Sequence, residues 1–109
     1  MDTANVHSTA LEHLELAGTS GGGRSAATLF GGHENTLRQT VIAITAGREL
    51  AEHESPGEAT LLVLSGHVRL ESGDRSWEGR DGDLLVIPDA RHSLHAVEDA
   101  AVLLTVAKR

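Results

Sequence analysis

The side chains best suited to chemistry in this chain are its seven histidines. The sequence contains no cysteine, which excludes disulfides and thiolate metal sites and leaves His, Asp and Glu as metal ligands. Two or three imidazoles and a carboxylate can hold a divalent ion, whereas metal-free neutral imidazoles act as hydrogen-bond donors and acceptors. The histidines beyond residue 30 are His33, His53, His67, His92 and His95.

Two other kinds of chemistry are disfavoured by the sequence. Ser55 follows His53 closely, but no nucleophile elbow or oxyanion loop accompanies the pair, so we discount a hydrolase. The connector at residues 19–23 is rich in glycine. It is not a phosphate-binding loop, because it lacks the Gly-Lys-Ser/Thr ending and a following helix.

The apolar pattern predicts the elements that would position these residues. Strands are expected at residues 24–30, 37–45, 60–64, 67–71, 76–78, 84–87, 92–97 and 101–107. The first is expected at a sheet edge, and the continuous apolar run at 84–87 predicts burial on both faces. Alternation at 67–71 places His67 on the surface. His92 and His95 are three apart, so they lie on opposite faces of a regular strand. Short, regularly spaced strands predict an all-β sandwich or barrel in a single domain.

A short helix is expected before the strands. Residues 9–12 fit a capping box, and Gly18 is the expected helix end. The apolar stripe at helical spacing consists of Ala10, Leu11, Leu14 and Ala17. We expect it to lie against the barrel or a partner subunit, with His13 solvated. The chain then divides into an N-terminal arm with a short helix at 1–20 and a barrel at 24–109.

Two stretches of the sequence resemble the two motifs of the cupin superfamily. In residues 47–66, a Gly is followed after five residues by His53, then by Pro and a Val-Leu-x-Gly ending. In residues 82–92, a Gly-Asp turn leads to a strand that ends in Pro and is followed by His92. The resemblance covers roughly residues 37–107. It implies the cupin double-stranded β-helix, a jelly-roll barrel, which agrees with the strand pattern.

The resemblance also implies a site, because cupins typically bind a divalent metal through two His and a Glu of the first motif and a His of the second. His53 and His92 match two of these positions, while Ser55 and Ala59 occupy the other two. Two of the four usual ligands are therefore missing. The further ligands that could complete a metal shell are Glu58, His95 and His33.

The expected function is binding of a small molecule, a divalent metal or both near His53 and His92, with the reaction unassigned. If a metal is bound, we expect Zn, Fe, Mn or Ni, and isomerisation, decarboxylation and oxygenation all stay open. The alternative is a metal-free module that senses a ligand or binds a partner. In cupins the strand at 37–45 lines the barrel, so either Arg38 or Gln39 could present a polar group into the cavity. The expected ligand-binding residues are His53, Ser55, Gln39 and His92.

Composition restricts the partners of the chain. The formal net charge of −7 disfavours nucleic acid, whose binding depends on Lys and Arg neutralising phosphates. Phe30 and Trp77 are the only aromatic residues, which argues against recognition by stacking. No stretch approaches the ~20 apolar residues that cross a bilayer, and no signal pattern is present, so we expect a cytoplasmic protein without membrane contact. Small cupins are often homodimers, and we expect one here.

Overall fold

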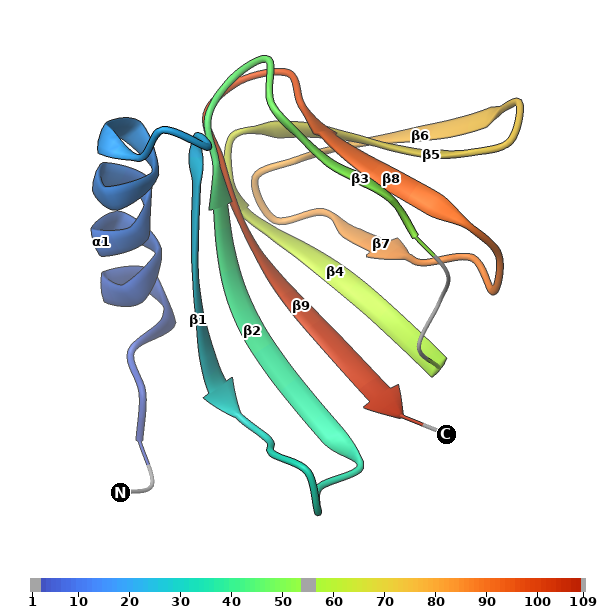
Figure 1. Ribbon diagram of the computed structural model, residues 1–109, viewed down its shortest axis with the longest axis horizontal. Helices are drawn as coiled ribbons and strands as arrows, with labels where there is room; N and C mark the ends of the chain where they lie inside the picture. The colour runs from blue at the N-terminus through green and yellow to red at the C-terminus, as the bar shows by residue number, and fades with distance from the viewer. Residues whose placement is uncertain (1–2, 54–56, 109) are drawn as a thin grey trace.

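The computed structural model describes residues 3–53 and 57–108, with the side chains of all of these except residues 52 and 53. The described residues form one helix and two antiparallel sheets (Figure 1). The elements in chain order are α1 (Val6–Thr19), β1 (Arg24–Phe30), β2 (Leu37–Ile44), β3 (Glu49–His53), β4 (Gly57–Ser65), β5 (His67–Ser72), β6 (Arg75–Arg80), β7 (Leu84–Val86), β8 (His92–Ala96) and β9 (Ala100–Lys108). The larger sheet has the order β1-β2-β9-β4-β7 and the smaller one β3-β8-β5-β6. The all-β architecture expected from the short strands is confirmed.

The core lies between the two sheets and is aliphatic. On β4, alternate residues Ala59, Leu61 and Val63 are buried, as expected for a strand with one face on a core. They pack with residues of β2, β5, β8 and β9. The sheets meet at the turns β2–β3 and β8–β9 and separate toward the far ends of β2, β4 and β9 (Figure 1).

The two sides of the sandwich differ. On one side β6 contacts β4 and β7, so the sheets are joined there. On the other side, between the edge strands β1 and β3, lies a hollow of about 340 Å³. It is lined by Arg24, Ser25, Ala26, Ile42 and Leu50.

Helix α1 covers the outer face of the larger sheet over β1, β2 and β9. It begins earlier than expected because Asn5, not Thr9, is the N-cap, and its side chain accepts from the backbone N–H of Ser8 at 2.8 Å. Ala10 and Leu14 pack on the sheet as expected, but Leu11 is 68% exposed, so the predicted stripe was wrong there. No helix in the described part of the chain is long and apolar enough to cross a membrane.

Two strands differ from the expectation. Strand β3 was not predicted, because its sequence is polar except for Leu50 and Ala51. Strand β7 was expected to be buried on both faces, but Leu84 is 60% and Val86 74% exposed. The reason is its place at the edge of the larger sheet, where it is paired with β4 on one side. Helix α1 lies on β1, β2 and β9 and does not cover β7.

Candidate functional site

His92 is the polar side chain that the fold buries between the sheets. It is the first residue of β8 and lies on the same inner face as Leu94 and Ala96. It is only 4% exposed. Its Nδ1 lies 2.9 Å from the carbonyl oxygen of Ala90. A carbonyl oxygen only accepts, so Nδ1 donates, and the lone pair of the neutral ring is then on Nε2. Nε2 of His92 is therefore suited to accept a hydrogen bond or to bind a metal.

One row of side chains crosses the inner face of the larger sheet near the start of β2. Arg38 on β2 pairs with Val106 on β9, and Val106 pairs with Ala59 on β4. Residues directly opposite in antiparallel strands share a face, so Arg38 lies on the same face as the buried Ala59 and Val106. Arg38 is exposed. The row therefore places the guanidinium-bearing Arg38 beside two buried aliphatic side chains.

Gln39, the expected ligand-binding residue of this strand, lies on the opposite face. Its Nε2 donates to Oγ1 of Thr105 at 3.3 Å, and the two residues are paired on the outer side of the larger sheet. The structure thus does not bring Gln39 together with His92. Of the two alternatives that the sequence left open, Arg38 is the one on the inner face.

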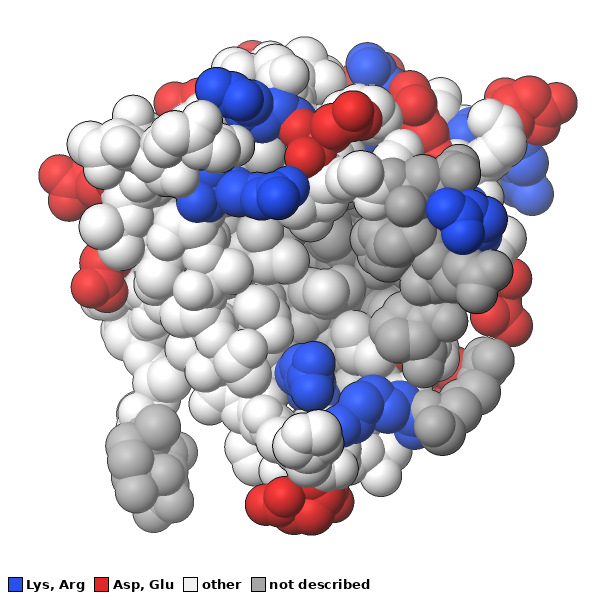
Figure 2. All heavy atoms as spheres, in the orientation of Figure 1, with Lys and Arg blue, Asp and Glu red and all other residues white. Residues whose placement is uncertain are grey.

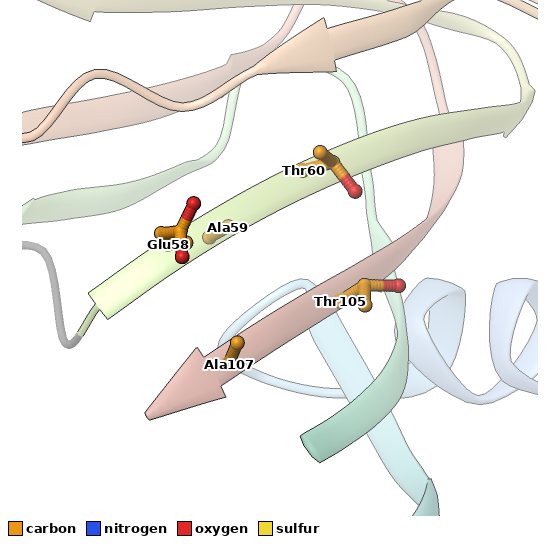
Figure 3. A pocket seen from close by; sticks show the side chains of 5 residues that line it. All are labelled: Glu58, Ala59, Thr60, Thr105 and Ala107. Carbon is orange, nitrogen blue, oxygen red and sulfur yellow. The ribbon is translucent and has the colours of Figure 1, made fainter. Parts of the chain in front are cut away.

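Glu58 also lies on the outer face of β4. Figure 3 shows Glu58 together with Thr60 and Thr105, which line the same hollow. These residues belong to a shallow hollow of about 200 Å³. Its lining is Glu58, Ala59, Thr60, Thr105 and Ala107. No bulge turns Glu58 inward, since its neighbour Ala59 takes the inner position. Glu58 is therefore separated from His92 by the sheet.

His95 and His33 do not join His92 either. His33 is exposed in the loop between β1 and β2. His95 lies on the outer face of β8, where Nδ1 is 3.1 Å from Glu49 and Nε2 is 3.0 Å from Glu71. Arg69 donates to Glu71 at 2.9 Å. This chain of charged groups links β3, β8 and β5.

Arg69 and His95 determine the electrostatics of the outer face of the smaller sheet. The hydrogen bond from Arg69 holds the pKa of Glu71 below its usual value of 4.5. Partial desolvation opposes this shift, and the charge of His95 adds to it. Beside the cluster lies a hollow of about 270 Å³, lined by Gly47, Arg48, Arg69, His95, Ala96 and Val97.

Two histidines expected to be solvated are held by neighbours. His67 faces outward as predicted, but it is only 7% exposed, and its Nε2 pairs with Oε1 of Glu78 on β6. His13 of α1 lies 2.6 Å from Oγ of Ser25 on β1 and is partly buried. Both contacts link elements of the fold, and neither histidine faces the space between the sheets.

The remaining predicted residues fall outside the described side chains. Ser55 is not among the described residues. The backbone of His53 is described and lies opposite His92 in register, after an irregularity that follows Leu50. This pairing agrees with the expectation that the two histidines meet, but the side chain of His53 is not described.

The described residues do not fit the metal shell that the resemblance implies. No group of three or more His, Asp or Glu among them is placed to hold an ion. On the inner face, the position expected for the carboxylate is the buried Ala59, and the described imidazole is that of His92. Among the described residues, the buried polar group on that face is the imidazole of His92.

Comparison with known proteins places this architecture among solved structures. A conserved Streptococcus pyogenes protein of unknown function is 30% identical, with a TM-score of 0.73 over 83% of this chain and 78% of that chain. A cupin superfamily protein from Desulfitobacterium hafniense is 15% identical, with a TM-score of 0.68 over 78% of this chain and 79% of that one. The sequence matches no protein-family model and no curated protein.

A third similar structure belongs to a much longer enzyme. It is a variant of salicylate 1,2-dioxygenase from Pseudoaminobacter salicylatoxidans in complex with gentisate, 20% identical, with a TM-score of 0.74. The match covers 94% of this chain but only 31% of the dioxygenase chain. The likeness to the dioxygenase and to the Desulfitobacterium protein shows the fold alone.

Proposed function

We propose that this chain, which has the cupin fold, binds a small molecule on the inner face of the barrel through His92, without a metal ion. The observation that carries the proposal is the burial of His92 on the inner face. A buried polar group is costly unless it is hydrogen-bonded. Here the hydrogen bond from Nδ1 to the carbonyl of Ala90 fixes the orientation of the ring.

The core between the sheets favours a ligand with an apolar body. Its positions on the larger sheet are aliphatic, among them Ala59, Leu104 and Val106. Ligand pockets typically combine such a lining with a few well-placed polar groups. A hydroxyl, amide or carboxyl group on the ligand would complement the imidazole of His92. We include His53 and Ser55 in this site as predicted ligand-binding residues.

Binding of a divalent metal by His53 and His92 is the second candidate. It is favoured by the register that sets the backbone of His53 opposite His92 and by the anchoring of Nδ1 to a carbonyl, which is common for metal-bound histidines. Two imidazoles with water would bind an ion weakly. We therefore prefer the metal-free site and assign no reaction.

A thermal-shift screen of small polar and apolar molecules tests the proposal on wild-type protein, His92→Asn and His33→Ala. Asparagine can keep the donor to the Ala90 carbonyl but removes the imidazole acceptor, so the variant separates folding from binding. We expect compounds that raise the melting temperature of the wild type and of His33→Ala but not of His92→Asn. Equal shifts in a folded His92→Asn would contradict the proposed site.

A further inference from the structure

We infer that β1 binds an extended peptide segment of another protein, which adds to the larger sheet as an antiparallel strand and carries a carboxylate opposite Arg24. The segment pairs with the β1 edge, the side of β1 that faces away from β2. Three features carry this inference, and none of them involves His92: the backbone groups of the β1 edge, the hollow beside it and the cations at its start.

The backbone groups that point to the β1 edge follow from the pairing with β2. Among the described strands, β2 is the one that pairs with β1. The N–H of Thr45 donates to the carbonyl of Gly23 at 2.8 Å. Hydrogen-bonded pairs alternate along antiparallel strands with pairs whose N–H and C=O groups point away from each other. The backbone groups of Arg24, Ala26 and Thr28 therefore point to the β1 edge.

The first part of β1 carries none of the usual protection of an edge strand. Natural edges are commonly protected by charged residues, proline or bulges. Residues 25–30 contain no charged residue and no proline, and the register with β2 is regular up to Thr28. Such an edge is a template on which another extended chain can pair.

The hollow of about 340 Å³ lies along the same edge. Its lining includes the consecutive residues 24–26 of β1, whose side chains alternate between the two faces, so the hollow follows the backbone of the strand. Ile42 and Leu50, which pack against the core, complete the lining. A residue opposite Ala26 on an added strand would share its face and that of Ile42. An apolar side chain is favoured at that position.

The start of the β1 edge is cationic. Arg24 is exposed, and its Nη1 donates to the carbonyl of Glu49 at 3.4 Å, which uses one of five guanidinium donors. Arg48 is also exposed and lies against the residue before β1, since a Cβ at Gly23 would be 2.7 Å from Cγ of Arg48. Figure 2 shows Lys and Arg atoms over the start of β1 and the turn between β2 and β3. A carboxylate opposite Arg24 would be attracted there.

This charge favours another protein over a second copy of the chain. If two β1 strands paired with each other, Arg24 of each copy would need a carboxylate from the other β1, whose sequence is Arg-Ser-Ala-Ala-Thr-Leu-Phe and has none. An antiparallel partner has its C-terminal end beside the start of β1. The segment that fits therefore has alternating apolar residues and an acidic residue at its C-terminal end.

The test titrates the peptide acetyl-Thr-Leu-Thr-Leu-Thr-Glu-amide into isotope-labelled full-length protein, followed by NMR. With its glutamate opposite Arg24, its leucines lie opposite Ala26 and Thr28 and their N–H groups point to β1. Methylation of both leucine nitrogens removes these donors, and we expect it to weaken binding about 10-fold or more. Methylation of the last two threonine nitrogens is the matched control. It alters N–H groups that point away from β1 and should change the affinity by about 2-fold or less.

Substitutions in the protein give the complementary test. Ala26→Pro removes an N–H that points away from β2, so the protein should fold with a melting temperature near that of wild type, and its affinity should fall about 10-fold or more. Arg24→Gln should weaken binding about 3-fold, as expected for an exposed ion pair, but not when the peptide ends in glutamine. Arg80→Gln, at an exposed arginine of β6, is the control and should bind both peptides as wild type does.

Several outcomes would overturn the inference. Absence of binding to wild type would do so, as would equal losses from methylated leucines and threonines, or undiminished binding to a folded Ala26→Pro. If Ala26→Pro does not fold, the methylated peptides decide. A dimer that persists in Val86→Lys but dissociates in Ala26→Pro would place a second copy on β1 instead. The thermal-shift screen tests the ligand site at His92 separately.

Discussion

At the scale of single residues, the alternation of side chains along a strand means that only one of two neighbouring residues can face the site. The sequence shows that Arg38 and Gln39 must face opposite sides, but not which one faces inward. The register with β9 settles it, because Arg38 pairs with the buried Val106 and Gln39 with Thr105. That pairing joins residues far apart in sequence, so local pattern cannot supply it. His92, by contrast, could be placed from its motif.

Gly66 supports a prediction at this scale. Its φ is +97°, and a Cβ there would lie 2.2 Å from the carbonyl oxygen of Asp99 and 2.7 Å from Cα of Ala100. Gly73 also has positive φ, +61°, but open space around it. We expect Gly73→Ala to lower the free energy of unfolding by about 1 kcal/mol. Gly66→Ala should cost at least about 1 kcal/mol more, because backbone must move.

Urea denaturation of both glycine variants measures this difference. Equal losses in Gly66→Ala and Gly73→Ala would show that the close approach to Asp99 and Ala100 can relax without cost. The turn between β4 and β5 would then be less constrained than its geometry indicates.

At the scale of elements, the sequence predicted eight of the nine described strands, but not β3. The alternation of β4, β5 and β8 reflects one buried face and is visible locally. Strand β3 is held by pairing with β8 and by the ion pair of Glu49 with His95. Those partners lie at least 39 residues away in sequence, so a polar segment such as β3 carries no local signal.

The ion pairs of this region predict a dependence on pH. Because the pKa of Glu71 is lowered in the folded protein, its charged form contributes stability that is fully present above the unfolded pKa, near 4.5, and lost as pH falls through the lowered folded pKa. We expect Glu71→Gln to have a lower melting temperature than wild type at pH 7, and the difference in melting temperature to shrink below pH 4.5.

Glu58→Gln is the matched control for this pH series, since Glu58 has no ion-pair partner among the described residues. Its melting temperature should follow that of wild type throughout. A constant difference in melting temperature between Glu71→Gln and wild type from pH 7 to pH 3 would contradict the role of the charge. The packing of the Glu71 side chain would then explain the difference.

Helix α1 provides a matched pair of leucine substitutions, one at a packed position and one at an exposed position. Leu14 packs on the cluster of Val41 and Ala101, whereas Leu11 is 68% exposed. We expect Leu14→Ala to lower the free energy of unfolding by about 2 kcal/mol, and Leu11→Ala to change it by about 0.5 kcal/mol or less. Urea denaturation separates the two, and similar losses would mean that α1 packs with a different face.

At the scale of the whole molecule, the homodimer expected from the sequence stays a prediction. The outer face of β7 offers a contact surface, because Leu84 and Val86 are exposed and large exposed apolar groups often mark interfaces. Light scattering should give a dimer for wild type and for Val97→Lys, and a monomer for Val86→Lys. A monomeric wild type would contradict the prediction.

Fold and function differ in how far the sequence could determine them. Strand pattern and two motifs were enough for the sandwich, because each strand needs only one buried face. The site depends on which groups meet across the two sheets, and the pairing of β2 with β9 decides that Arg38 faces inward. Fold alone assigns no chemistry, since one architecture hosts many functions.

The central claim is that the site at His92 works without a metal ion. Elemental analysis of untagged protein purified without chelator tests it most directly, together with melting curves recorded with and without EDTA. The metal-free site predicts far less than one equivalent of Zn, Fe, Mn or Ni and an unchanged melting temperature in EDTA. Near-stoichiometric metal that is lost in His92→Asn, with a melting temperature lowered by EDTA, would contradict it and establish a metal centre at His92.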